Sequence, residues 1–216
     1  MSTSYAQNAQ TKPSRMPERA VYDVEAVNNV IDEALVCHVS YALDGVPHVL
    51  PTLHVRQDAN LYIHGSTGAR LMLASGEPIP VSIAITLMDG IVLARSWFNH
   101  SINYRSVIVH GLASRVTDPD EKWEAMVALM NHVAPGRADS SRDANKREFA
   151  ATAILRIPLA DVSLKARSGL PSVDEEDAAS PYYWDGVMPI ATVFGPAISA
   201  CDLALPDYLV NYRRSD

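Results

Sequence analysis

The spacing of hydrophobic and polar residues changes several times along this chain, and each change predicts a new element. Apolar positions in residues 24–35 recur at helical spacing, and Asp23 can cap that helix. From residue 36 the period becomes two, as in a strand with one buried face. Residues 36–42 and 46–56 flank Asp44-Gly45, a strong signal for a two-residue hairpin turn.

Further strands follow the same alternation. Residues 81–88 and 91–97 flank a second Asp-Gly pair, Asp89-Gly90, and predict a second hairpin. Shorter or β-branched runs predict strands at 61–64, 106–116 and 152–158, with a short helix around 71–73. These runs argue for an antiparallel barrel or sandwich rather than alternating βαβ units.

A second long helix is expected after residue 118. Asp118 can cap it, a proline follows in the first turn, and Glu121 stands three residues after the cap. Trp123, Met126, Val127 and Met130 form its apolar stripe, which is interpreted as core rather than as a ligand site. Residues 137–147 are polar and predict a surface loop that leads into another short helix.

The domain organisation is expected to be simple. Residues 1–20 are interpreted as a mobile N-terminal tail, because the first eighteen are polar and lack apolar periodicity. Residues 21–216 form a single domain with a C-terminal extension. The predicted fold class is mainly β with peripheral helices.

Composition limits the kinds of binding partner and the cellular location that we expect. The 216 residues carry a formal net charge of -7, which argues against non-specific nucleic-acid binding. No run resembles a signal peptide or a membrane span, so a cytoplasmic protein without a membrane partner is expected. Cys37 and Cys201 are interpreted as two unpaired thiols in a reducing compartment.

Two polar segments carry most of the candidate chemistry, residues 62–70 and residues 99–106. Each follows a strand-like run and mixes small residues, hydroxyls and one arginine, a combination that suits a phosphate. In the first, backbone N–H groups, Ser66 and Arg70 could meet one anion between a strand and a short helix. In the second, Arg105 either joins the same ligand or forms an ordinary salt bridge.

Other kinds of site are weakly supported. The seven histidines include no pair with helical zinc-protease spacing and no Cys–His cluster, so no metal site is expected. Nucleophile motifs are absent. Lys165, Arg167, Tyr182, Tyr183 and Trp184 are interpreted either as a tail packed over the barrel or as a wall for a flat aromatic ligand.

The order of these motifs resembles that of a known family. Leu50-Pro51-Thr52, then residues 62–66 with Arg70, then Asn103-Tyr104-Arg105-Ser106-Val107 leading into Gly111, is similar to the flavin-binding split-barrel proteins. That superfamily includes the pyridoxamine 5'-phosphate oxidases and the nitroimidazole-resistance reductases, and the second branch is the more similar. The likeness covers about residues 22–160.

The resemblance implies a six-stranded antiparallel split β-barrel of Greek-key type that forms a homodimer, with FMN at the subunit interface. It places the isoalloxazine beside the strand that holds Leu50, Pro51, Thr52 and Leu53. The phosphate end would contact four residues of the first polar segment and two of the second: His64, Gly65, Ser66, Arg70, Arg105 and Ser106. Trp184 would stack on the flavin.

The implied activity is a flavin-dependent oxidoreductase that acts on a small molecule, with His64 as the catalytic residue. Electrons would enter and leave at the flavin N5. Vitamin B6 oxidation is disfavoured, because the C-terminal substrate motif of the oxidases is not recognisable. Two alternatives stay open: a non-catalytic flavin-binding or sensing protein, and haem binding by the same fold.

Overall fold

The computed structural model describes residues 3–179, 182–210 and 212. Residues 1–2 of the predicted tail and residues 213–216 of the extension lie outside the described residues. The described strands are β1 (Ala20–Val21), β2 (Val36–Leu43), β3 (Val46–Gln57), β4 (Asn60–Ser66), β5 (Ile79–Leu93), β6 (Ser101–Arg115), β7 (Thr152–Pro158), β8 (Asp161–Arg167) and β9 (Gly186–Pro189). The helices are α1 (Val24–Glu33), α2 (Arg70–Ala74), α3 (Pro119–Val133), α4 (Lys146–Ala151), α5 (Glu175–Ala178) and α6 (Asp207–Val210), with 3-10 turns at Pro17–Arg19 and Trp97–Asn99.

Six of these strands close into a barrel in the order β2-β3-β4-β7-β6-β5, and β5 pairs with both β2 and β6 to complete the ring. Every strand pair is antiparallel. The split-barrel prediction is therefore confirmed. Completely buried Ile31 of α1 joins Ile63, Ile83 and Val109 in one apolar core that fills the barrel.

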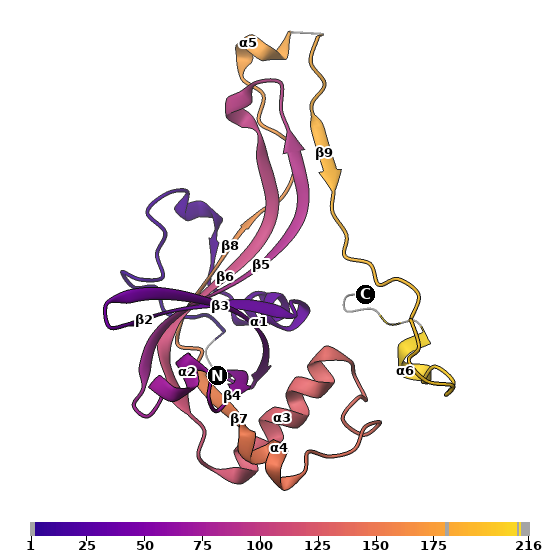
Figure 1. Ribbon diagram of the computed structural model, residues 1–216. Helices are drawn as coiled ribbons and strands as arrows, with labels where there is room; N and C mark the ends of the chain where they lie inside the picture. The colour runs from indigo at the N-terminus through magenta and orange to yellow at the C-terminus, as the bar shows by residue number, and fades with distance from the viewer. Residues whose placement is uncertain (1–2, 180–181, 211, 213–216) are drawn as a thin grey trace.

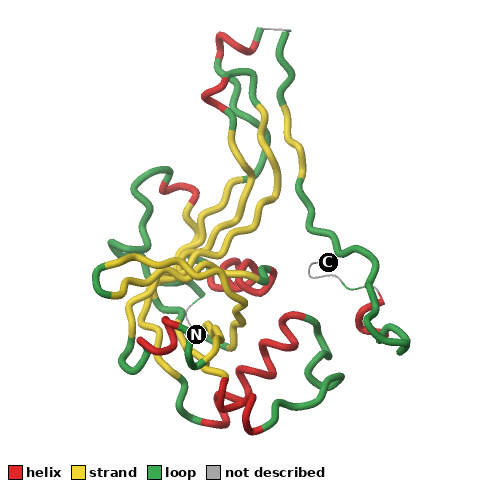
Figure 2. The backbone as a smooth tube through the Cα atoms, in the orientation of Figure 1, coloured by secondary structure: helices red, strands yellow, loops and turns green. Residues whose placement is uncertain are grey.

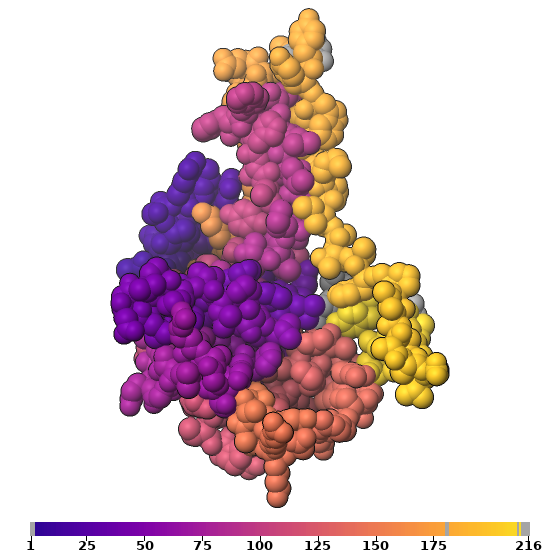
Figure 3. Space-filling model, viewed as in Figure 1, coloured from indigo at the N-terminus to yellow at the C-terminus, as the bar shows by residue number. Residues whose placement is uncertain are grey.

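The outer halves of β5 and β6 leave the barrel and form a long arm (Figure 1). The upper part of β6 pairs with β8, and β9 lies along the arm beside β5. From β9 the chain returns beside the barrel as an extended C-terminal segment, drawn in yellow in Figure 3. Figure 2 shows that this segment is mostly loop.

Local signals placed most elements correctly. Asp23 accepts a hydrogen bond from the backbone N–H of Ala26 at 2.8 Å and caps α1. Asp118 accepts hydrogen bonds from the backbone N–H groups of residues 120 and 121 and caps α3. Asp44 and Gly45 have φ of 51° and 76°, the left-handed values that a tight hairpin turn requires.

The predicted second hairpin at Asp89-Gly90 is wrong. β5 runs straight through this pair, with a bulge between Met88 and Gly90, and turns back only at residues 94–100. The backbone carbonyl of Asp89 accepts a hydrogen bond from Ile190 N–H at 3.1 Å. Strand β9 also passes so close to Gly90 that a Cβ there would lie 2.9 Å from Val187. The glycine is therefore needed for a close approach of two strands rather than for a turn.

The N-terminal segment lies along β8 through specific contacts. Tyr5 N–H donates to the carbonyl of Tyr22 at 2.8 Å, and the Tyr22 hydroxyl donates to the carbonyl of Thr11 at 3.0 Å. Lys165 of β8 donates to the carbonyl of Arg15 at 2.8 Å. Among the described residues, no helix has the length and apolar character needed to cross a bilayer.

Candidate functional site

One edge of β3 is open where the sequence analysis expects the flavin ring. Residues 46–53 pair with β2, and pairing with β4 begins only at His54. Within the described chain, the other side of residues 46–53 therefore has no strand partner, and this stretch includes Leu50, Pro51, Thr52 and Leu53. Unpaired backbone N–H and C=O groups at such an edge can hydrogen-bond a flat heterocycle.

The loop after β4 presents side chains rather than backbone groups. Thr67 N–H donates to the carbonyl of Ala151 at 2.9 Å, and the N–H groups of residues 68 and 69 both donate to Ser66. The N–H groups of residues 67–69 are therefore already paired, and phosphate binding by other backbone N–H groups of this segment stays a prediction. Exposed Ser66 and Arg70 remain available, and Arg70 forms no hydrogen bond or ion pair within the described chain.

Gly65 is explained by packing. A Cβ at this position would lie 2.9 Å from the Cε of Met72, a completely buried residue of α2. The glycine lets α2 lie directly against the end of β4, which places Arg70 in the first turn of that helix beside Ser66. Its role as a direct cofactor contact stays a prediction.

Arg105 and Ser106 do not join that loop within one chain. Adjacent residues of a strand point to opposite faces, so Arg105 and Ser106 face different sides of β6. Arg105 also stands ten residues before Arg115, which donates to a backbone carbonyl of α2, and ten residues span about 33 Å along an extended strand. Arg105 forms ion pairs with Glu33 and, at 2.8 Å, with Asp89. The hydrogen bonds that its guanidinium donates to these two carboxylates raise the pKa of Arg105. The salt-bridge interpretation of Arg105 is confirmed, and a cofactor role for it stays a prediction.

Ser106 and Trp184 are likewise held away from the loop in the same protomer. The Ser106 hydroxyl lies 3.0 Å from that of Thr86 on the neighbouring strand. Trp184 lies on the arm with its side chain 65% exposed, packed against Gly186. Neighbouring Asp185 anchors this stretch through an ion pair of 3.2 Å with Arg95.

His64 lines a groove that the sequence analysis did not predict. Residues 61 and 63 of β4 point into the barrel, so Tyr62 and His64 lie on the outer face that α3 covers. The groove has a volume of about 390 Å³. Its walls are His64, Trp123, Met126, Val127, Leu129, Met130, Ala138, Ser141, Arg142, Asp143, Ala144, Glu148 and Thr152.

The interpretation of the α3 stripe as core is confirmed only in part, because Met126 packs against a buried apolar cluster but also lines this groove. Only Ala125 and Leu129 of α3 are buried, whereas Trp123, Met126, Val127 and Met130 line the groove. Helical spacing alone could not reveal this, because a stripe facing a groove and a stripe facing the core have the same period. Residues of the polar loop 137–147 also line the groove, so the stripe faces this loop rather than only the core.

The ring of His64 has no hydrogen-bond partner within the described chain, and its Nδ1 atom is completely buried. Burial disfavours the charged imidazolium and lowers the pKa of His64. A neutral imidazole with a free lone pair beside an apolar groove can accept a proton, orient a ligand or coordinate a metal centre.

A second cavity, of about 690 Å³, lies between the barrel and the C-terminal segment. Glu33, Val36, His38 and Thr86 contribute its barrel side, and Phe194 and Tyr212 contribute the other side. The aromatic rings of Phe194 and Tyr212 pack edge to face with centroids 4.6 Å apart.

Residues 23–166 match the family model described as pyridoxamine 5'-phosphate oxidase. The match spans well over half of the chain. The chain belongs to this family. No curated protein matched the chain in a sequence search.

Two solved structures extend the family likeness over nearly the whole chain. The flavocytochrome Anf3 from Azotobacter vinelandii is 33% identical, with a TM-score of 0.88, over 97% of this chain and 99% of its own. An FAD and haem binding protein from Mycobacterium smegmatis is 33% identical, with a TM-score of 0.83, over 88% of this chain and 95% of its own. The likeness to the Anf3 chain therefore extends beyond the residues matched by the family model.

A 5-nitroimidazole antibiotic resistance protein from Bacteroides thetaiotaomicron shares the fold. It is 19% identical, with a TM-score of 0.56, over 68% of this chain and 85% of its own. The resemblance to the flavin-binding split-barrel superfamily is thus confirmed, and the three matches together cover both the nitroimidazole-resistance branch and the flavocytochromes.

Proposed function

We propose that this chain is a flavin-dependent oxidoreductase that also holds a haem. The observation that carries the proposal is 33% identity along 97% of the chain to a flavocytochrome, together with equal identity to an FAD and haem binding protein. When bound, a flavin exchanges electron pairs and a haem exchanges single electrons. The sequence alternative of haem binding by the same fold thus joins the flavin prediction instead of competing with it.

The residues fit a flavin. The open edge of β3 offers backbone groups to the ring, and Ser66 with Arg70 offers a hydroxyl and a guanidinium to the ribityl phosphate. The sequence analysis expects FMN, and the M. smegmatis relative is described as binding FAD. Both flavins carry the same ring and the same first phosphate, so both use these residues, and the extracted cofactor distinguishes them.

A second copy of the chain is part of the proposal. Within one protomer Arg105 pairs with Glu33 and Asp89, and Trp184 lies beside Gly186 on the arm, so in this proposal these residues and Ser106 reach the flavin across a subunit interface. The tip of the arm exposes Trp97 at 95% and Phe98 at 87%. Large exposed aromatic surfaces are typical of contact sites, which supports a homodimer with the flavin at the interface. The proposal also includes a small-molecule substrate and a cytoplasmic location. The two free thiols are consistent with the reducing conditions of the cytoplasm.

The purified full chain tests the flavin and the dimer directly. We expect flavin absorption bands, release of FMN or FAD on denaturation, and a mass twice the 23.5 kDa of one chain by light scattering. Flavin at a hundredfold excess over its Kd is expected to stabilise the fold by about 2.7 kcal/mol. If the purified protein is colourless and neither FMN nor FAD raises its melting temperature, the proposal is contradicted.

Turnover separates an oxidoreductase from a flavin sensor. The bound flavin is reduced anaerobically and offered quinones, nitroaromatics and B6 vitamers. Reoxidation faster than that of free flavin supports the enzyme, and reoxidation at the free-flavin rate supports the non-catalytic alternative. In this assay His64→Ala, with flavin retained, reports whether His64 is catalytic.

A further inference from the structure

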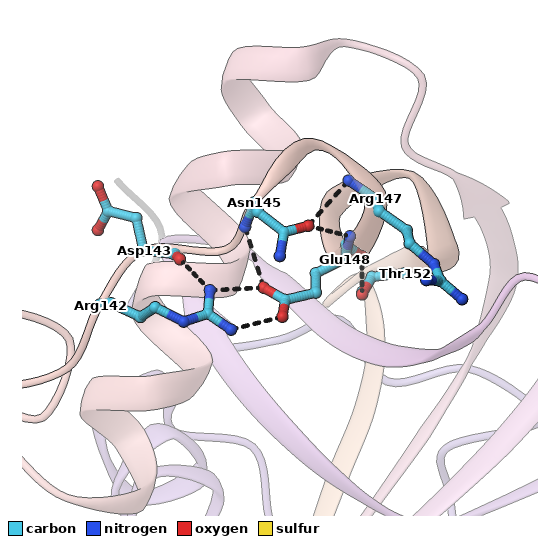
Figure 4. A network of polar contacts seen from close by, with 6 residues as sticks. All are labelled: Arg142, Asp143, Asn145, Arg147, Glu148 and Thr152. Carbon is cyan, nitrogen blue, oxygen red and sulfur yellow. Dashed lines mark hydrogen bonds and ion pairs between the residues drawn. The ribbon is translucent and has the colours of Figure 1, made fainter.

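The groove beside α3 and the larger cavity differ in how their charged groups are paired. At the mouth of the groove, the exposed Arg142 guanidinium donates to both carboxylate oxygens of Glu148, at 2.8 and 2.6 Å (Figure 4). Glu148 also accepts from the backbone N–H of Asn145 and completes a capping box at the start of α4. These charges stabilise the local fold, and His64 belongs to the expected flavin site. The residues that line the larger cavity have neither of these roles.

The walls of the larger cavity are mostly apolar. Leu35, Val36 and Leu87 line its barrel side, and Val193 and Phe194 line the side of the C-terminal segment. Val36 and Phe194 are each 44% exposed, and Val193 is 83% exposed. A bound molecule would remove this apolar surface from water, which favours binding. A cavity of about 690 Å³ with such walls is typical of a small-molecule site.

The outer wall of the cavity is anchored at both ends. Where the segment leaves the arm, Ile190 N–H donates to the carbonyl of Asp89 at 3.1 Å. At the other end, the Tyr212 hydroxyl donates to the carbonyl of Val133. The edge-to-face packing of Phe194 on Tyr212 joins the two parts of the wall. These two rings therefore form a fixed aromatic surface against which a flat ring can pack.

The polar groups of the cavity favour an uncharged ligand. Of the described residues that line it, only Glu33 is acidic, and its carboxylate accepts hydrogen bonds from the Arg105 guanidinium. Its charge is therefore already compensated. The ring of His38 is exposed and forms no hydrogen bond within the described chain. A neutral imidazole carries one N–H donor, so it can bind an oxygen atom of the ligand.

The cavity lies beside the strand that is expected to hold the flavin ring. Val36 and His38 of β2 are the register partners of Leu53 and Pro51 of β3. Directly opposite residues of an antiparallel pair point to the same face of the sheet, with Cα atoms about 4.5–5.5 Å apart. A molecule in the cavity would therefore lie next to a flavin bound along this part of β3.

We infer that the larger cavity binds the electron-accepting substrate of the flavin, an uncharged flat aromatic molecule that carries a carbonyl or nitro oxygen. The inference rests on the proposed function, since it takes the flavin to lie along β3. The aromatic ring packs against Phe194, and the His38 ring donates a hydrogen bond to the oxygen. With a quinone, the reduced flavin supplies two electrons and one proton as hydride, water supplies the second proton, and the products are hydroquinone and oxidised flavin.

Binding is measured on the full-length protein with its flavin oxidised. The probe is duroquinone, an uncharged quinone whose fully substituted ring does not add the exposed thiol of Cys201. Oxidised flavin does not reduce it, so calorimetry reports binding alone. Wild type is expected to bind one duroquinone per chain, and His38→Ala and Phe194→Ala to bind it about tenfold more weakly. His48→Ala is the matched control, because His48 lies on β3 outside the cavity and stacks on Tyr41.

Turnover with reduced flavin gives a second readout. His38→Ala is expected to raise the KM for duroquinone about tenfold with little change in kcat, because the hydrogen bond is made by the bound substrate. His38→Gln, which keeps an N–H donor, is expected to restore most of the affinity. His64→Ala is expected to bind duroquinone like wild type, since His64 lies in the other groove.

Different outcomes bear on the proposed function and on the cavity. If the protein binds no flavin, or if its reduced flavin reacts with every acceptor at the free-flavin rate, the proposed function fails and the cavity is not a substrate site. If the flavin turns over but His38→Ala and Phe194→Ala bind duroquinone like wild type, the cavity assignment is overturned and the proposed function stands. Displacement of duroquinone by equimolar haemin, or equal loss of binding in His48→Ala, overturns it as well. The flavin content and circular dichroism of each variant identify misfolding, and a folded His38→Gln that binds as weakly as His38→Ala contradicts the hydrogen bond.

Discussion

The two halves of strands β5 and β6 have similar alternating sequences, but they lie in different surroundings. In the barrel half, Ile83, Ile85, Val107 and Val109 are completely buried in one core. In the arm half the apolar surface is only partly covered, and Ile91 is 44% exposed. The barrel half buries its apolar side chains within one chain, whereas the arm leaves apolar side chains exposed that another surface could cover. The barrel half thus carries the core of the fold, and the arm half carries the surface where we propose that a second copy binds.

The largest expected effect is the loss of stability caused by a substitution in the barrel half. Ile83→Ala removes a buried side chain and is expected to cost about 2–5 kcal/mol of unfolding free energy. Ile91→Ala, on the same strand, is expected to cost less than about 1 kcal/mol, because much of this side chain already contacts water. Urea denaturation measures both. Equal losses would show that the arm is as integral to the fold as the barrel.

A third variant, at the arm position of this pair, sharpens the proposal about assembly. Ile91→Asp introduces a charge on the arm and is expected to shift the protein from dimer to monomer with little change in secondary structure. Light scattering over a dilution series measures the shift. An unchanged dimer constant would remove this part of the arm from the interface.

The two arginines provide the next contrast, of about one order of magnitude. Arg70→Ala is expected to weaken flavin binding about tenfold or more, because it removes a charge-assisted contact of about 1.5–3 kcal/mol. Its effect on stability without flavin is expected to be small, since Arg70 is exposed. Flavin titration followed by fluorescence measures the affinity. Arg137→Ala, another exposed arginine, is the matched control, and equal affinities would remove Arg70 from the site.

Arg105→Ala is expected to behave in the opposite way. It leaves Glu33 and Asp89 without their shared cation and is expected to cost about 1 kcal/mol, a value that allows for the partial solvent exposure of all three side chains. Thermal unfolding of the flavin-free protein measures the loss. If the variant instead unfolds like wild type and binds flavin tenfold more weakly, Arg105 is a cofactor ligand across the interface.

The smallest expected effect is the pH dependence of His64. Because burial lowers its pKa in the folded state, the unfolded chain binds more protons, and stability falls as the pH drops through the ordinary histidine value of about 6.5. His64→Gln is expected to remove this part of the loss between pH 8 and pH 5. Urea midpoints at both pH values test it. An identical pH dependence in wild type and variant would place the ring in water.

Predictions from sequence succeeded where neighbouring residues decide the conformation. The caps Asp23 and Asp118, the turn at Asp44-Gly45 and the strand at residues 152–158 agree with the structure, because each depends on hydrogen bonds or periodicity within a few residues. The resemblance that led to a flavin protein also rests on short motifs in their order along the chain.

Predictions failed where the conformation depends on contacts between residues far apart in the chain. Asp89-Gly90 has the composition of a turn, but β9 and Arg105 hold it in a continuous, bulged strand. The two polar segments each contain an arginine suited to phosphate, but in the folded chain two carboxylates already pair with Arg105. Neither outcome is visible in the residues themselves, because each contact joins positions far apart in the chain.

The amino-acid sequence by itself determined an antiparallel β fold, its helix caps, its first hairpin and the candidates Ser66 and Arg70, since these follow from local periodicity and side-chain chemistry. The resemblance of its motifs to a known family added the split barrel and the candidate His64. Only the tertiary structure decided that the stripe of α3 forms a groove, that His64 lies in it with a free ring, and that the arm projects from the barrel. These features arise because residues of the loop 137–147 line the groove together with α3 and because β9 pairs with β5, and such long-range packing is not encoded in the period of either segment alone.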